Sequence, residues 1–165
     1  MDLHQLAADI DCSTYEPSQF PGLIYKPPVG GTLSLFASGK YTITGIKNEI
    51  AMRDVENQLF DELRSLGISL EISPNATIRN IVCTGDLGQE LDLSTLSVIL
   101  GVSNVEYEPE QSPFLIYRPK YSNCVMTIAS TGKTVITGLV TKDEAEEAFA
   151  NLAHEISQMV TNDDK

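Results

Sequence analysis

The sequence predicts an α+β fold built from two similar halves, each with an antiparallel sheet and helices on one side. Much of residues 15–45 is repeated in residues 107–138, including Tyr-Glu-Pro, Leu-Ile-Tyr, a Thr/Ser-Gly-Lys turn and Ile-Thr-Gly. Alternating apolar and polar residues within this text are typical of strands, and helical spacing follows each copy. A period of roughly ninety residues is too long for a solenoid unit, so we expect duplication of a half-domain.

The first half, residues 1–74, should begin with a short helix at residues 2–10, where Leu3, Leu6 and Ile10 have helical spacing. Prolines make residues 15–21 a loop. A three-stranded meander is expected next, at Leu23–Tyr25, Thr32–Phe36 and Lys40–Thr44.

A long amphipathic helix is expected over residues 48–66, with Asn48 and Gly67 at its ends. One side of this helix should be buried against the sheet. The residues expected on that side are Ile50, Val55, Leu59, Leu63 and Leu66.

The second half, residues 75–165, should repeat this order with one addition. The first half ends with a strand-like segment, residues 68–74. The addition in the second half is a strand predicted at Arg79–Gly85, which has no counterpart in the first half. A short helix at Leu91–Leu100, a second meander and a long helix at Lys142–Met159 are expected to follow. The residues expected on the buried side of the long helix are Ala145, Ala148, Phe149, Leu152, Ile156 and Met159.

The net charge of −12 argues against a uniformly basic nucleic-acid-binding surface. However, residues 17–48 and 111–142 contain no Asp or Glu, so all 23 acidic residues lie elsewhere. Their basic residues are Lys26, Lys40, Lys47, Arg118, Lys120, Lys133 and Lys142. We therefore expect one mildly basic face and one strongly acidic face. The rarity of acids in strands is an alternative explanation, but it does not account for the retained lysines and arginines.

Several classes of protein are not indicated. The chain has no 18-residue apolar run and its first residues do not resemble a signal peptide, so a soluble intracellular protein without membrane contact is expected. Cys12, Cys83 and Cys124 have neither CxxC spacing nor nearby histidines, which argues against a metal site or a disulfide framework. Neither a catalytic constellation nor a phosphate loop is present, so neither an enzyme nor a cofactor is predicted.

The repeated text resembles the TATA-box-binding protein family, in its archaeal form. The resemblance spans nearly the whole chain. It rests on Tyr-Glu-Pro-Glu-Gln and Pro-x-Leu-Ile-Tyr-Arg within residues 107–118, Phe-Pro-Gly-Leu-Ile-Tyr at 20–25, Phe-Ala-Ser-Gly-Lys at 36–40, both Ile-Thr-Gly triplets and Arg-Asn-Ile-Val at 79–82. It implies a pseudo-twofold saddle, a curved antiparallel sheet that places its concave face on the DNA minor groove and carries helices on its convex face.

The resemblance implies a general transcription initiation factor that binds A,T-rich (TATA) double-stranded promoter DNA and recruits transcription factor B. An archaeal protein would act in the cytoplasm with the nucleoid, and a eukaryotic one in the nucleus. Phe20 and Phe36 would form a pair that wedges between bases, called here the wedge pair, and Asn80 would contact base edges. The contact surface would comprise Thr44, Val82, Val135 and Thr137.

The same resemblance assigns phosphate contacts to Lys26, Lys40, Lys47, Arg118 and Lys133. It also assigns contact with factor B to Glu108, Glu110 and Gln111. Structural alternatives exist: the phenylalanines as core aromatics, Asn80 as a partner for the backbone of an adjoining strand, and the glutamates as solvated loop acids.

The chain also departs from the family pattern. Ser112 and Ala129 stand where a second wedge pair is expected, and neither can unstack bases; Phe114 replaces a glycine and could partly substitute. Ser34 and Thr127 replace apolar residues, and Val140 replaces a lysine. The missing first strand would remove a partner of Asn80 and expose a strand edge, leaving open a homodimer. These departures favour an alternative function, a diverged paralogue that regulates by binding transcription proteins, with weak or no DNA binding.

Overall fold

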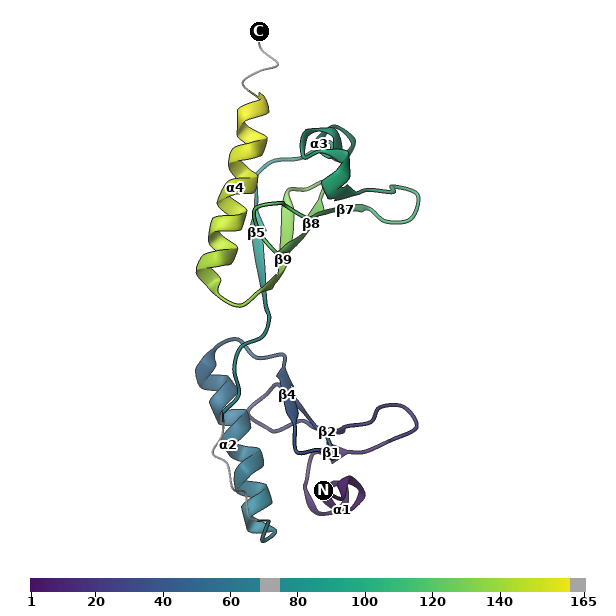
Figure 1. Ribbon diagram of the computed structural model, residues 1–165, viewed down its shortest axis with the longest axis vertical. Coiled ribbons are helices and arrows are strands. Elements are labelled where there is room, and N and C mark those ends of the chain that lie inside the picture. Colours follow the sequence, from purple (N-terminus) through teal and green to yellow (C-terminus); the bar gives the residue numbers. More distant parts are fainter. Residues whose placement is uncertain (69–74, 161–165) are drawn as a thin grey trace. The chain divides into compact units, whose positions relative to one another are not determined.

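The computed structural model describes residues 1–68 and 75–160, and the side chains of these residues as far as residue 158 (Figure 1). The chain divides into two compact units, Met1–Thr77 and Ile78–Lys165. The first unit contains α1 (Leu3–Asp9), β1 (Ser13–Thr14), β2 (Leu23–Tyr25), β3 (Thr32–Leu35), β4 (Tyr41–Thr44) and α2 (Glu49–Ser65). The second contains β5 (Ile81–Asp86), α3 (Leu93–Ile99), η1 (Val102–Asn104), β6 (Val105–Glu106), β7 (Phe114–Tyr117), β8 (Val125–Ala129), β9 (Lys133–Leu139) and α4 (Lys142–Val160).

Each unit has its own antiparallel sheet. The strand order is β1-β2-β3-β4 in the first unit and β5-β9-β8-β7-β6 in the second. The predicted α+β class and both meanders are therefore confirmed. The first unit has no counterpart of β5, and no strand in the described part of the chain pairs with the outer edge of β4.

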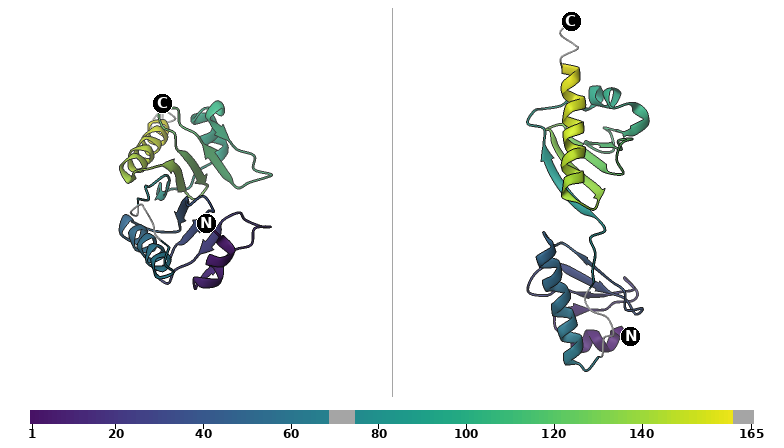
Figure 2. Two further views of the ribbon diagram at one scale, coloured as in Figure 1. Left: turned by 60° about the horizontal axis from the view of Figure 1, so that its bottom comes forward. Right: turned by 60° about the vertical axis from the view of Figure 1, so that its left-hand side comes forward.

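The helices begin and end where local side chains satisfy their terminal backbone groups. The Asn48 side chain accepts a hydrogen bond from the Ala51 N–H at 2.9 Å, and Gly67 follows α2 with a φ of 77°. Asp92 caps α3 in the same way, through Ser94 N–H. Both views of Figure 2 show α4 lying along the strands of its own unit. No helix within residues 1–68 and 75–160 is long and apolar enough to cross a membrane.

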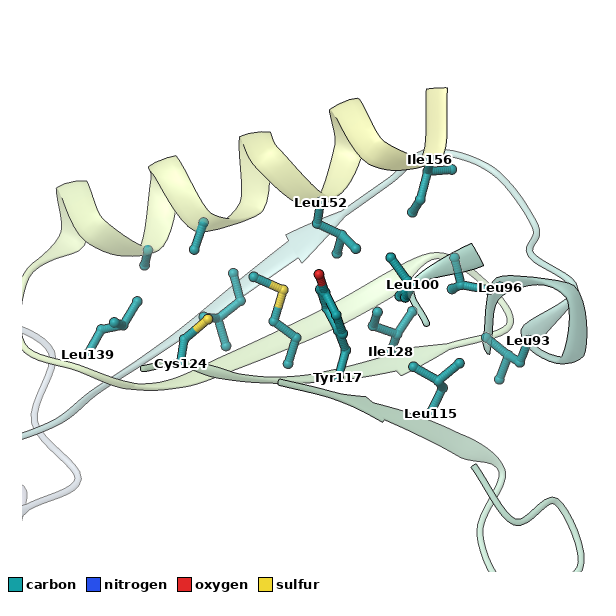
Figure 3. Close-up of a cluster of buried hydrophobic side chains, with 14 residues drawn as sticks. Leu93, Leu96, Leu100, Leu115, Tyr117, Cys124, Ile128, Leu139, Leu152 and Ile156 are labelled. Carbon is teal, nitrogen blue, oxygen red and sulfur yellow. The ribbon is translucent and has the colours of Figure 1, made fainter. Parts of the chain in front are cut away.

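A separate hydrophobic cluster fills each unit between its sheet and its helices. In the second unit, Leu152 of α4 points toward the strands, beside the Tyr117 ring (Figure 3). In the first unit, Leu59 of α2 packs in one cluster with Leu23 and Leu33 of the sheet. Burial of one such side chain is worth about 1.5–3 kcal/mol. Only one face of each sheet is buried in this way. The other face, called here the outward face, is not packed against any helix in the described part of its own unit.

Two residues of the expected buried side of α2 are in fact exposed. Ile50 is 75% exposed and Leu66 is 39% exposed. Ile50 lies nine residues before Leu59, which is two and a half helical turns, so it faces the opposite side. Leu66 follows the last helical residue. The buried face instead includes Met52, Glu56 and Phe60.

Some features were not predicted, and some predictions cannot be compared. The two-residue strands β1 and β6 and the short helix η1 have no strong sequence signal. The strand expected from Arg79 begins at Ile81. The strand expected over residues 68–74 and the burial of Met159 lie outside the described part of the chain, apart from Ile68, which is not in a strand.

Candidate nucleic-acid interface

The outward face of the second unit carries uncharged side chains in register across the middle of the sheet. Along β9, Thr134 and Ile136 are buried, whereas Val135 is exposed and Thr137 is half-buried. One row crosses β7, β8, β9 and β5 and consists of Ile116, Thr127, Val135 and Thr84. Val125 lies opposite Thr137 in the next row. The result is a ladder of β-branched side chains on an uncovered sheet face.

The first unit repeats these rows. Ile24, Ser34 and Thr42 lie opposite one another on β2, β3 and β4, and Thr32 lies opposite Thr44. Thr42 and Thr44 are both exposed. Thr44 was predicted at this surface and Thr42 was missed, although the two-residue period of the strand places both on one face.

Phe20 and Phe36 meet at the end of the first sheet. Their ring centroids are 5.8 Å apart and the rings are tilted by 58°, a geometry within the favourable range for aromatic pairs. Phe20 is 36% exposed and Phe36 is half-buried. Neither belongs to the hydrophobic cluster of this unit, so the alternative of two core aromatics is not supported.

Gly22 makes room for this pair. A Cβ atom on Gly22 would stand 2.8 Å from Cε1 of Phe20 and 3.1 Å from Cε1 of Phe36. Any larger side chain would displace the rings. Sequence reasoning did not single out Gly22, because its role depends on Phe20 in the loop before β2 and on Phe36 in the turn after β3.

The second unit builds the same loop with different side chains. Phe20 N–H donates to Glu16 O at 3.0 Å, and Ser112 N–H donates to Glu108 O at 2.9 Å. Ser112 therefore occupies the position of Phe20. On β7, Phe114 is 45% exposed and lies opposite Ala129. The aromatic residue of the second unit thus stands at the position that Gly22 holds in the first.

Asn80 is bound to the neighbouring strand. Its Oδ1 accepts a hydrogen bond from Gly138 N–H at 2.8 Å, which is the structural alternative considered for this residue. Val82 lies at an irregularity in the pairing of β5 with β9 and is 63% exposed. Both residues are exposed, but the Asn80 carbonyl already has a protein partner.

The predicted phosphate-contacting residues are all exposed. Lys133 on β9 lies opposite Asp86 on β5. Arg118 forms an ion pair with Glu106, with Nη2 3.2 Å from Oε1. Arg118 would have to leave Glu106 in order to bind a phosphate. For Lys26, Lys40, Lys47 and Lys133, no ion pair is found in the described part of the chain.

The predicted partner-binding residues lie in the loop between β6 and β7, which extends away from the body of its unit (Figure 1). The Gln111 side chain donates to the Glu108 carboxylate, and Gln111 N–H donates to Glu108 O at 2.9 Å. Glu110 is exposed beside them. The matching residues Gln19 and Glu16 make the same pair in the first unit.

Polar contacts on the helix-covered side differ between the units. Glu56 is fully buried and accepts from the Tyr41 hydroxyl, from Ala76 N–H at 2.7 Å and from Arg53 at 2.8 Å. Burial opposes ionisation of Glu56, but these hydrogen bonds outweigh it and lower its pKa. In the second unit Tyr117 donates to Glu155 at 3.0 Å. Burial, together with the charge of Glu155, raises the pKa of Tyr121 to about 12.

Fold and surface together define a class: a duplicated α+β protein whose two antiparallel sheets are covered by helices on one face and left open on the other. The family model for "Transcription factor TFIID (or TATA-binding protein, TBP)" matches residues 1–66 and 75–159. The chain therefore belongs to the TATA-box-binding protein family, as its repeated text suggests.

Individual relatives agree with this assignment. The TATA-box-binding protein of Haloarcula marismortui is 38% identical over 161 residues, which cover 96% of this chain and 86% of the relative. TATA-box-binding protein D of Halobacterium salinarum is 41% identical over 155 residues, covering 93% of this chain and 82% of the relative. Among solved structures, the Methanococcus jannaschii TBP matches with a TM-score of 0.84 and 37% identity, covering 95% of this chain and 89% of that one.

Proposed function

We propose that this chain is a general transcription initiation factor that binds A,T-rich promoter DNA in the minor groove and recruits transcription factor B. The observation that supports this most is the Phe20–Phe36 pair, which lies outside the hydrophobic cluster at the end of the first sheet, beside the exposed Thr42 and Thr44. The names of the relatives point to the same ligand, a TATA box. In an archaeal cell the protein would act in the cytoplasm, at the nucleoid.

The outward faces suit a minor groove rich in A·T pairs. In that groove A·T pairs present only acceptors, whereas guanine adds a protruding amino group. Val82, Thr44, Val135 and Thr137 would pack against the groove floor, which a guanine amino group would obstruct. The Phe20–Phe36 pair would enter a base step and kink the duplex, and the bent DNA would contact more of the sheet.

Polar residues around these faces would fix the position of the DNA. Lys26, Lys40, Lys47 and Lys133 would contact phosphates, which sets position without reading sequence. Arg118 would join them once released from Glu106. The side-chain carbonyl of Asn80 accepts a hydrogen bond from Gly138 N–H. Its side-chain NH₂ group would donate hydrogen bonds to acceptors on the bases.

The loop at residues 107–111 would contact factor B. The Gln111–Glu108 hydrogen bond constrains the loop, and Glu110 stands exposed beside it. A basic surface on factor B would complement these two carboxylates.

Two observations favour a second candidate, a regulator that binds transcription proteins with little DNA binding. Ser112 and Ala129 leave the second unit without the two-ring pair of the first. The acidic net charge of −12 also opposes DNA binding.

A fluorescence bending assay separates the two candidates. An A,T-rich duplex labelled at both ends is titrated with the protein, with and without factor B, at low and high salt. A G,C-rich duplex and the exposed helix variant Ile50→Ala serve as controls. Bending of the A,T-rich duplex by the protein alone supports the initiation factor. Binding to factor B without bending would instead favour the regulator.

A further inference from the structure

We propose that Phe114 is a second DNA-inserting residue, which replaces in the second unit the wedge pair that Phe20 and Phe36 form in the first. This proposal rests on the proposed function and names one more residue of that site. It follows from comparing the two units position by position.

The backbone establishes which positions correspond. Leu23 lies opposite Leu35 in the first sheet, and Leu115 lies opposite Ile128 in the second. One residue outward, Phe114 is opposite Ala129, so Phe114 matches Gly22 and Ala129 matches Phe36. The equivalent loop hydrogen bonds already match Ser112 to Phe20.

The two arrangements exclude one another sterically. In the first unit the rings occupy both outer positions, and a Cβ atom at Gly22 would stand 2.8 Å from Phe20. In the second unit both outer positions hold small residues, and the ring stands at the central position. A ring at the centre of the first unit would force both outer rings to move, whereas the small outer residues of the second unit leave room for one, so Ser112, Phe114 and Ala129 form one consistent set.

Phe114 is exposed and firmly anchored. Its side chain is 45% exposed, whereas the next residue, Leu115, is fully buried. The Phe114 N–H donates to the Ser112 hydroxyl at 3.2 Å, which constrains the backbone before β7. An exposed ring on a strand held by the core can contact a base with little loss of conformational entropy.

A single ring presents less surface than a pair. Aromatic side chains that unstack bases gain stacking and apolar contact with each base they touch. The second unit should therefore kink the DNA through one ring, and less strongly than the first unit does through two. The geometry points to a site with one strong and one weak kink.

Base unstacking provides the test. The fluorescent adenine analogue 2-aminopurine is placed at either end of the A,T-rich site in two otherwise identical duplexes, and the two fluorescence increases are summed, so that the orientation of binding does not matter. Wild-type protein is compared with Phe114→Ala, with Phe20→Ala/Phe36→Ala and with the triple variant. Anisotropy measured in parallel establishes saturation.

We expect Phe114→Ala to lose part of the summed signal and to bind about tenfold more weakly. The Phe20→Ala/Phe36→Ala variant should retain a residual signal that the triple variant lacks. A bound double variant without residual signal, or a Phe114→Ala signal equal to wild type, would overturn the proposal. Wild-type protein that does not bind the duplex would overturn the proposed function, and this proposal with it.

Three further variants control for folding and test the exchange directly. Val98→Ala removes a 71% exposed apolar side chain from α3 and should leave the signal unchanged. Phe114→Leu keeps apolar bulk on β7, so it should fold as the wild type does and give a reduced signal. The exchange Ser112→Phe/Phe114→Gly/Ala129→Phe gives the second unit the residues of the first, and should raise the signal above wild type.

Discussion

The two units end their sheets with the same backbone but distribute aromatic rings differently over it. The first unit brings Phe20 and Phe36 together beside Gly22, whereas the second places Phe114 opposite Ala129, with Ser112 at the position of Phe20. The backbone hydrogen bonds that position Phe20 and Ser112 have nearly equal N–O distances, 3.0 and 2.9 Å. The difference shows that a duplicated scaffold can keep its loop geometry while its exposed residues diverge, provided that they change together.

The largest expected effects come from substitutions in the two hydrophobic clusters. These substitutions test whether each cluster stabilises only its own unit. Leu59→Ala and Leu152→Ala each remove a fully buried side chain, so each should lower the free energy of unfolding of its own unit by about 2–5 kcal/mol. Amide hydrogen exchange would show where protection is lost. Equal loss of protection in both units from either change would contradict the separation of the two clusters.

The next largest effect concerns the wedge pair. Phe20→Ala/Phe36→Ala should abolish bending contributed by the first unit and weaken DNA binding by roughly tenfold to a hundredfold, since two stacking rings are lost. The end-labelled bending assay measures this directly. Unchanged bending would show that Phe20 and Phe36 do not insert between bases. Ile50→Ala serves as the matched control.

A third prediction uses Glu56, the buried carboxylate of the first unit, which accepts a hydrogen bond from Ala76 N–H. Folding lowers the pKa of Glu56 from its unfolded value, close to 4.5. The ionised carboxylate therefore stabilises the fold in full at pH values above 4.5. This stabilisation is lost as the pH falls through the lower pKa that Glu56 has in the folded protein. Glu56→Gln should cost about 1–3 kcal/mol at neutral pH.

The Glu56→Gln variant should also show a weaker dependence of stability on pH below about 4.5, because the titrating group is gone. Urea unfolding followed at several pH values measures both effects. The matched change Glu155→Gln in the second unit should leave the acid response of the first unit as it is. An unaltered acid dependence in Glu56→Gln would show that other carboxylates govern it.

A smaller effect is expected at Gly22. In Gly22→Ala the added Cβ atom would force the half-exposed Phe20 ring to move. DNA binding should weaken severalfold, roughly the loss expected from one displaced stacking contact, with little change in thermal stability. Gly39→Ala is not a suitable control because Gly39 has a φ of 82°. Ile50→Ala, which removes a 75% exposed side chain from α2, is a suitable control.

The smallest effect concerns Arg118, whose ion pair with Glu106 has no equivalent in the first unit, where Thr14 holds the matching position. Glu106→Gln should free Arg118 for a phosphate without measurable change in stability, since exposed ion pairs contribute little. The plot of log K against log salt should steepen by about one. An unchanged slope would mean that removing the Glu106 charge adds no phosphate contact at Arg118.

Local signals in the sequence were sufficient for the architecture. The repeat, the alternation in the meanders, the helical spacing and the cap at Asn48 are all set by neighbouring residues. The structure confirms both meanders and the four α-helices that these signals predicted, whereas the strand expected over residues 68–74 stays a prediction. The repeated motifs were equally sufficient for the family, because they span most of the chain.

Tertiary structure alone decided which faces and partners the individual residues have. Asn80 is bound to Gly138, 58 residues later in the chain. The exchange between Gly22 and Phe114 depends on which residues two strands bring opposite each other. These outcomes depend on contacts between distant segments, whereas the signals that predict strands and helices extend over a few residues.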